Sequence, residues 1–276
     1  MSKRVITSTL DFSQWYRDYM AHIGFAEQPP TRWDKRAHAM QQKGLLMSPY
    51  IQTFLAAIDF KDVSTVLDVG SGNGVLALQI APLVEQVYCL DYSRVMLDYV
   101  ELNARAAGLD NITTIHLSKE DEWQGRVPEV DILISSRSGL DADVERLFNK
   151  FHRYAKKHIY YSYLVGGHFD QAAISELLNQ QQAPYPDYIH IVNVLYEMGI
   201  DANLNFVQTA GRLENCTDET AFLKQMEQQY GELGAEQTVL LKDFFHQEKA
   251  HFNGPKYGMK WALINWPVPH QNAASR

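Results

Sequence analysis

Three glycines at alternate positions, Gly70, Gly72 and Gly74, follow a short apolar run that contains Asp68. An apolar run that breaks into glycines and then resumes with helical spacing predicts a buried strand, a loop and a helix. In open α/β sheets, an extended nucleotide-like ligand lies at such a junction, against the carboxyl end of the first strand. Glycines let the backbone approach that ligand closely, and a carboxylate beside the loop suits a positively charged group. The stretch therefore predicts a ligand-binding loop.

A second acidic residue stands where a carboxylate meets the hydroxyls of a ribose. Residues 86–91 have the pattern of a second short strand ending in Asp91, and Tyr92, Ser93 and Met96 follow it. In a βαβ unit of about 30 residues, an acid at this point reaches the ribose. Nicotinamide-dependent enzymes place an acid there too, so Asp91 alone does not identify the ligand.

The two motifs together resemble those of class I S-adenosylmethionine-dependent methyltransferases. Residues 68–74 match the family pattern D-x-G-x-G-x-G, and residues 91–96 match D-x-S-x-x-M. The dinucleotide fingerprint has the different spacing G-x-G-x-x-G. The resemblance implies S-adenosyl-L-methionine as cofactor, S-adenosyl-L-homocysteine as product, and methyl transfer by in-line displacement. It also implies a Rossmann-like α/β fold with seven mostly parallel strands in the order 3-2-1-4-5-7-6 and helices on both faces.

The resemblance assigns a set of residues to cofactor binding. Family members carry an acidic residue after the third strand that receives the adenine amino group. In this chain Glu120, Asp121 or Glu122 fits that place, and rough alignment favours Asp121. The full set is Asp68, Gly70, Ser71, Gly72, Asn73, Gly74, Asp91, Tyr92, Ser93, Met96, Glu120, Asp121 and Ser135.

The methyl acceptor is expected at the end of the fourth strand, residues 130–136. Family enzymes that methylate adenine or glutamine carry N/D-P-P-Y/F there, whereas this chain has Ser-Ser-Arg-Ser at 135–138. That difference argues against adenine or glutamine as the acceptor. Arg137 either binds a substrate carboxylate or phosphate or pairs with Asp141 or Asp143.

Two further residues are predicted to bind substrate, and three are candidates for a general base. Trp33 and Arg36 share a face of a predicted helix, and an arginine on an apolar face requires an anionic or aromatic partner. A base is needed only if the acceptor arrives protonated, and the groups to test are then Tyr16, Tyr163 and His168. No residue is assigned as catalytic.

The chain divides into three parts. Residues 1–47 are predicted to form a helical lid, with Thr31 and Asp34 as a capping box that opens the second helix. Residues 48–276 form the cofactor-binding domain. Within it, a helical insertion at about 210–257, with Thr217 as a helix cap, either completes the acceptor pocket or forms a homodimer interface. The interface is the preferred interpretation.

Composition favours a cytoplasmic enzyme with a small-molecule partner. The 276 residues carry a net charge of −8, which gives no basic footprint for nucleic acid. Two cysteines make neither a disulfide framework nor a metal site, and no metal-ligand spacing is present. No run of 18 apolar residues and no leader-like apolar segment occurs, so neither membrane insertion nor export is expected.

Two alternatives from other classes stay open. An NAD-dependent oxidoreductase is favoured by Asp91 and opposed by the glycine spacing. A non-catalytic S-adenosylmethionine-binding regulatory module would bind the cofactor without methylating anything. Its acceptor side should be filled by bulky side chains rather than open.

Overall fold

The protein is built on one sheet of seven strands. The computed structural model describes residues 10–269 except 43, 46, 170 and 182. The strands are β1 (Thr65–Val69), β2 (Gln86–Asp91), β3 (Ile112–His116), β4 (Val130–Ser135), β5 (Ala155–Leu164), β6 (Asn203–Thr209) and β7 (Met259–Pro267). Their order is β3-β2-β1-β4-β5-β7-β6, and β7 runs antiparallel to both of its neighbours. The order predicted from the family resemblance is confirmed.

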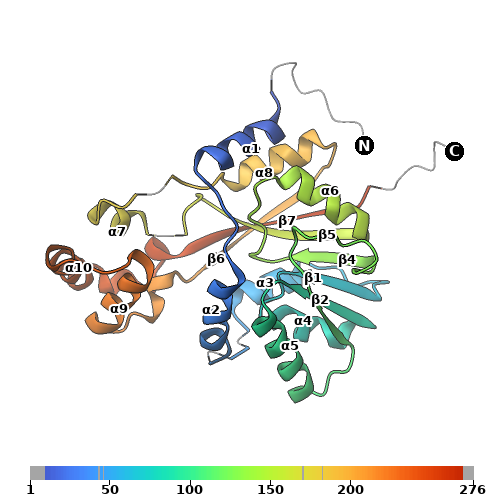
Figure 1. The fold of residues 1–276 in the computed structure, drawn as a ribbon, viewed down its shortest axis with the longest axis horizontal. Helices are drawn as coiled ribbons and strands as arrows, with labels where there is room; N and C mark the ends of the chain where they lie inside the picture. Colours follow the sequence, from blue (N-terminus) through green and yellow to red (C-terminus); the bar gives the residue numbers. More distant parts are fainter. Residues whose placement is uncertain (1–9, 43, 46, 170, 182, 270–276) are drawn as a thin grey trace.

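Helices cover both faces of the sheet (Figure 1). One face packs against α1 (Phe12–His22), α6 (Val144–Tyr154) and α8 (Tyr188–Glu197), and the other packs against α3 (Pro49–Ala56), α4 (Val75–Ile80) and α5 (Arg94–Ala106). Side chains alternate across a strand, so Leu67 and Val69 enter the first core while Val66 enters the second. Because both faces are covered, the ligand side of the sheet is the edge where the strands end.

The N-terminal residues do not form a single lid. Helix α1 packs against α6 and α8, where Tyr16 and Met20 are buried in the core. Only α2 (Pro30–Gln42), which packs on α5, and the segment before it lie beside the edge where β1 and β2 end. Thr31 lies inside α2 and is not its cap. The helix already begins at Pro30, whose fixed φ and missing N–H suit the first helical position.

The insertion and the earlier helix α7 share a small core that is separate from the two cores of the sheet. Helices α7 (Ala172–Leu177), α9 (Glu219–Tyr230) and α10 (Ala235–Glu248) pack around Phe222, Leu241 and Phe245. Four short 3-10 helices complete the chain: η1 (Ala81–Leu83), η2 (Arg212–Asn215), η3 (Lys249–His251) and η4 (Pro255–Tyr257). Asp218, not Thr217, caps α9, because its carboxylate accepts a hydrogen bond from the Ala221 N–H at 2.8 Å. In the described part of the chain, every helix is too short or too polar to cross a bilayer.

Candidate active site

A cavity of about 510 Å³ opens at the carboxyl edge of the parallel strands. Its wall includes Asp68 at the end of β1, Asp91 at the end of β2, Ser136 after β4 and Tyr163 near the end of β5. Helix α2 covers it from one side, and the start of β7 closes it from another. A cavity of this size accommodates a small-molecule ligand. It lies where the sequence predicts the ligand-binding loop.

The three glycines of the loop have different structural roles. All have left-handed backbone conformations, with φ of 72° at Gly70, 56° at Gly72 and 84° at Gly74. A Cβ on Gly70 would lie 2.4 Å from the Cβ of Ser138, and one on Gly74 would lie 2.8 Å from a methyl of Leu78. A Cβ on Gly72 would meet only the end of the Met40 side chain, at 3.8 Å, because this residue borders the cavity. Among the three glycines, Gly72 is therefore the one with open space beside its backbone on the cavity side.

Asp91 fastens this loop while bordering the cavity. Its carboxylate accepts hydrogen bonds from the Gly72 N–H at 2.9 Å and from the Ser93 N–H at 2.8 Å. Burial raises the pKa of Asp91, and these N–H groups oppose the rise by stabilising the carboxylate. A carboxylate held in this way keeps lone pairs for hydroxyl donors on a ligand.

Asp68 is a buried acid that faces the cavity without a donor. Its side chain is 2% exposed, and no donor in the described chain hydrogen-bonds to it. Burial, together with the nearby charge of Asp91, raises its pKa to about 7. A buried carboxylate without a partner is costly, so a cationic group in the cavity would be strongly favoured beside it.

Other predicted cofactor residues divide into two groups. Ser71, Asn73, Tyr92 and Met96 line the cavity together with the residues already described. The remainder lie outside the lining: Gly74, Ser93, Glu120, Asp121 and Ser135.

Local hydrogen bonds account for the second group. The Ser93 hydroxyl caps α5 by accepting from the Met96 N–H and donates to Asp34 at 2.6 Å. Asp121 accepts from the Ser118 N–H at 2.8 Å and closes a turn that leaves Ser118 and Lys119 on the cavity wall. At this loop, Ser118 and Lys119 line the cavity, whereas Glu120 and Asp121 lie outside the lining.

The predicted acceptor residues do line the cavity. Arg137 has a left-handed φ of 56°, unusual for a residue with a side chain, and its N–H donates to the Ser162 hydroxyl at 2.8 Å. Its guanidinium lies 4.1 Å from the centre of the Tyr50 ring and does not pair with Asp141 or Asp143. The Arg36 guanidinium lies 5.3 Å from the centre of the Trp33 ring. Because the Arg137 guanidinium contacts Tyr50 and neither aspartate, the alternative of a structural ion pair with Asp141 or Asp143 is wrong.

Of the three base candidates, only Tyr163 borders the cavity. Tyr16 is fully buried and donates to the backbone oxygen of Asp141 at 3.1 Å, while His168 is exposed and outside the lining. Burial raises the pKa of both tyrosines, so neither phenolate forms readily at neutral pH. The geometry favours none of the three as a base.

Several lining residues were not expected from the sequence, above all Arg212, Phe169 and Trp261. The position of Arg212 just after β6 could have indicated its place. Strand β6 runs parallel to β5, so its carboxyl end reaches the same edge of the sheet. Trp261 reaches the same edge because β7 runs in the opposite direction, so that its start, rather than its end, lies there. It lies near the start of the antiparallel strand β7.

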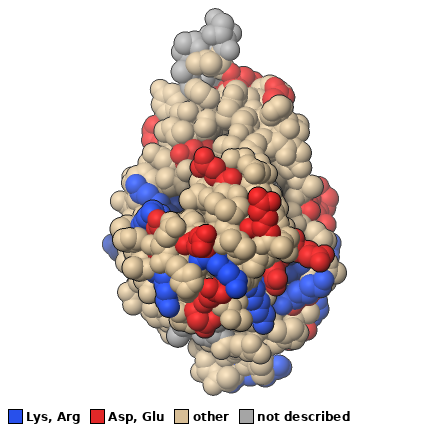
Figure 2. Space-filling model, turned by 90° about the vertical axis from the view of Figure 1, so that its left-hand side faces the viewer, with Lys and Arg blue, Asp and Glu red and all other residues tan. Residues whose placement is uncertain are grey.

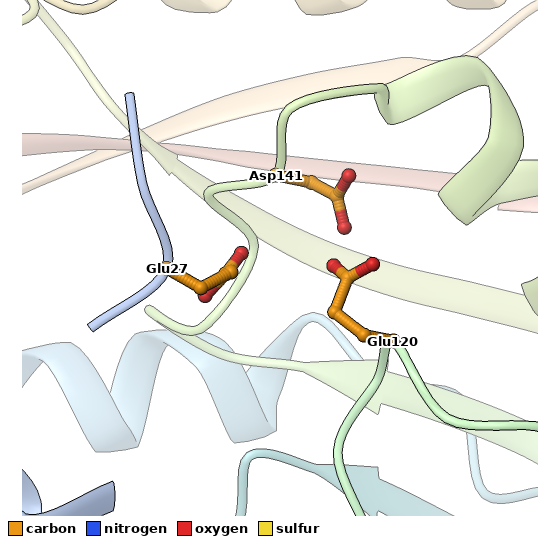
Figure 3. A group of neighbouring side chains, drawn as sticks. All are labelled: Glu27, Glu120 and Asp141. Atoms are coloured by element: carbon orange, nitrogen blue, oxygen red, sulfur yellow. The ribbon is translucent and has the colours of Figure 1, made fainter. Parts of the chain in front are cut away.

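Three carboxylates, those of Glu27, Glu120 and Asp141, lie near one another (Figure 3), and Glu27 also lines the cavity. Oxygens of Glu27, Glu120 and Asp141 lie within 4.8 Å of one another, although sequence spacing indicates no metal site. The Lys119 ammonium lies 3.0 Å from Glu27 and 3.8 Å from Asp141, and Arg146 pairs with Asp141 at 3.3 Å and with Glu120. Burial raises the pKa of Asp141 to about 6, although Lys119 opposes the rise. These cations make the cluster an ion-pair network that holds the segment before α2.

Comparison with known proteins gives three kinds of similarity. A family model described as "Methyltransferase domain" matches residues 66–158. An uncharacterized protein of Haemophilus influenzae is 33% identical over 262 residues, which cover 94% of this chain and 97% of that protein.

Two solved structures share the fold. Coclaurine N-methyltransferase, bound to N-methylheliamine and S-adenosylhomocysteine, gives a TM-score of 0.52 at 15% identity over 94% of this chain and 88% of its own. Phosphoethanolamine N-methyltransferase 2 of Haemonchus contortus gives 0.54 at 16% identity over 96% of this chain and 61% of its own. At these identities the likeness concerns the fold.

Proposed function

Because the chain belongs to the class I S-adenosylmethionine-dependent methyltransferases, in one family with the Haemophilus influenzae protein, we propose that its methyl acceptor is a small molecule. The observation that carries this proposal is a single cavity whose wall holds Asp68 and Asp91 at two strand ends together with Arg36 and Arg137. Helix α2 and the start of β7 both line this cavity of about 510 Å³, a volume that suits a small ligand.

The cofactor end of the cavity fits S-adenosylmethionine. When bound, this cofactor supplies a methyl group on a positively charged sulfur. We assign Asp91 to the ribose hydroxyls, the unpartnered carboxylate of Asp68 to the positive charge, and Tyr92 and Met96 to the adenine. Gly70, Ser71, Gly72 and Asn73 form the wall along the methionine part. Gly74, Ser93, Glu120, Asp121 and Ser135 are assigned supporting roles, because they shape the surrounding loops.

On the acceptor end, we assign Trp33, Arg36 and Arg137 to substrate binding. The residues hold donor and acceptor in line and exclude water, which can correspond to an effective molarity of about 10⁵–10⁸ M.

Titration calorimetry with S-adenosylhomocysteine and with NADH tests the cofactor. We expect the full-length protein to bind S-adenosylhomocysteine and not NADH, because the loop spacing and the buried acid at Asp68 suit a cationic ligand without phosphates. Binding of NADH without binding of S-adenosylhomocysteine would contradict this proposal and favour the NAD-dependent oxidoreductase.

A valine at Gly72 tests the position of the loop. We expect Gly72→Val to lower the affinity for S-adenosylhomocysteine at least tenfold, because its side chain would enter the cavity. Gly108→Val is the matched control. Gly108 also has a left-handed backbone, with φ of 68°, and a Cβ there would meet nothing within 4 Å. Equal losses in both variants would mean that backbone strain, rather than cavity access, causes the effect.

The remaining expectations on partners and location are also proposals. Both cysteines, Cys89 and Cys216, are buried free thiols, which supports a reducing compartment such as the cytoplasm.

The face that carries α9 and α10 has acidic and basic side chains interspersed and no single basic patch (Figure 2), which supports an acceptor other than nucleic acid. A homodimer through the insertion is proposed on the exposed apolar residues Val239 and Leu240 of α10.

A further inference from the structure

Three guanidinium groups from distant parts of the chain reach the acceptor end of the cavity. Arg36 comes from α2, Arg137 from the loop after β4, and Arg212 from η2 after β6. Within the described ranges, neither Arg36 nor Arg137 forms an ion pair with a carboxylate. Cationic side chains gathered in this way suit an anionic ligand.

Arg137 is held in place before any ligand binds. The Tyr50 hydroxyl makes hydrogen bonds of 2.7 Å with both Ser136 and Ser162, which fix the ring beneath the guanidinium. Ser162 also accepts from the Arg137 N–H and so supports the left-handed backbone. Backbone strain of this kind persists where the surroundings over-determine it, as they do at ligand sites. The stacked guanidinium keeps the N–H groups of its edge for a planar anion.

An aromatic surface separates Arg137 from Arg212. The Trp261 and Phe169 rings lie 6.2 Å apart, centre to centre, and both line the cavity. The Arg137 guanidinium lies 5.9 Å from the Trp261 ring, and the Arg212 guanidinium lies 5.7 Å from the Phe169 ring. A ligand with an apolar or aromatic body would bury it against these two rings and place an anionic group on a guanidinium.

The charges at the mouth of this site repel one another. Burial lowers the pKa of Arg36, and the neighbouring positive charges of Arg212 and Arg32 lower it further. Like charges brought together in a cavity are stabilised when a ligand supplies the opposite charge.

We propose that the methyl acceptor is a small anionic molecule, in which a carboxylate or phosphate binds Arg137 and an apolar body packs on Phe169 and Trp261. This inference rests on the proposed methyltransferase function. In the reaction the bond from sulfur to methyl breaks and its electron pair stays on sulfur. A lone pair of the acceptor forms the new bond, and any proton on that atom passes to water. Because Arg137 binds the anionic group, it determines which molecules can present that lone pair to the methyl group.

Calorimetry on the full chain saturated with S-adenosylhomocysteine tests the acceptor class. The probes are benzoate and phenyl phosphate, with benzamide and benzylamine as neutral and cationic counterparts of similar shape. We expect the anions to bind at least tenfold more tightly than the counterparts, and less tightly as KCl is raised. The ratio of the two anions tells carboxylate from phosphate.

One variant and a control separate charge from folding. Arg137→Gly removes the guanidinium and leaves a residue that favours the left-handed backbone, so it should fold as the wild type does. It should lose at least tenfold in anion affinity and keep S-adenosylhomocysteine affinity. Arg94→Gln removes an equal charge from an arginine paired with Asp98 on the surface of α5 and should change neither.

Three outcomes overturn the proposal: equal binding of the neutral or cationic probes, full anion binding by Arg137→Gly, or anion dissociation constants weaker than about 10 mM. Failure of S-adenosylhomocysteine to bind the wild type would instead contradict the proposed function.

Discussion

At the scale of single residues, two acids at adjacent strand ends differ in what surrounds them. Asp91 accepts two backbone N–H groups, whereas Asp68 accepts none from the described chain and has a pKa raised to about 7. The sequence predicts both acids near the ends of apolar strands, and both line the cavity. It could not tell them apart, since the difference depends on which loop N–H groups fold back onto each carboxylate.

The raised pKa of Asp68 predicts a pH-dependent stability. Between the ordinary value of 3.8 and about 7, the folded protein keeps this proton while the unfolded chain loses it. Stability of the unliganded protein therefore falls as pH rises through this window and stays low above it. Asp68→Asn removes the penalty, so urea unfolding should show the variant more stable by up to about 4 kcal/mol at pH 8 and by less at pH 5.

The same variant should bind S-adenosylhomocysteine, which keeps the ammonium of the cofactor, more weakly than the wild type. Asp110→Asn, at an exposed carboxyl after α5, serves as the control and should change neither property. A stability gain of equal size at both pH values would contradict the assignment.

At the scale of elements, α2 is fastened to α5 by side-chain hydrogen bonds. Asp34 accepts from the Ser93 hydroxyl at 2.6 Å, and His38 contacts the Tyr99 hydroxyl at 2.6 Å. The sequence predicts α2 and the apolar face that includes Trp33, but these bonds join residues about 60 positions apart. Pattern reasoning over a single helix does not indicate such partners. For the same reason, the sequence predicts one lid from residues 1–47 and does not indicate that α1 packs on α6 and α8 instead.

Asn103 connects α2, α5 and the glycine loop. Its amide donates to the Asn73 backbone oxygen and to Gln41, both at 3.1 Å, and accepts from Gln41 at 2.6 Å. Asn103→Ala should lower the free energy of unfolding by about 1–3 kcal/mol, because a buried carbonyl loses its donor. S-adenosylhomocysteine binding should weaken as well, since Asn73 lines the cavity. Both quantities are measured by urea unfolding and calorimetry.

A matched variant shows whether these effects arise from the connection. Asn203→Ala removes an exposed asparagine whose amide donates only to Asn265, at 3.3 Å, far from the glycine loop in the sheet order. It should unfold and bind as the wild type does. If Asn103→Ala weakened binding without lowering stability, α2 would be held by other contacts.

At the scale of the whole molecule, the sequence predicts the sheet better than the site. Strand order follows from the family motifs and from regular βα alternation, and all seven strands are found. The acceptor end depends on Arg212 and Trp261, which belong to the least regular part of the chain. The insertion was expected mainly as an interface, yet its 3-10 helix η2 supplies a guanidinium to the cavity.

The outer face of α10 leads to a prediction for the assembled molecule. Val239 and Leu240 are 58% and 36% exposed, although Leu241 beside them is fully buried in the core of the insertion. Adjacent apolar residues exposed to solvent are typical of a protein–protein interface. In a two-fold symmetric homodimer, α10 of one subunit would pack against α10 of the other. Analytical ultracentrifugation should then give twice the 31.6 kDa of one chain.

Val239→Lys should shift this equilibrium to the monomer, because the dimer would bury two unpaired ammonium groups. S-adenosylhomocysteine affinity should stay unchanged, since α10 contributes nothing to the described lining of the cavity. Leu83→Lys is the control, because Leu83 is 56% exposed in η1, away from the insertion. A wild type that sediments as a monomer at high concentration, or a dimer that Leu83→Lys disrupts equally, would contradict an interface on α10. The insertion would then act through η2 alone, as a wall of the acceptor site.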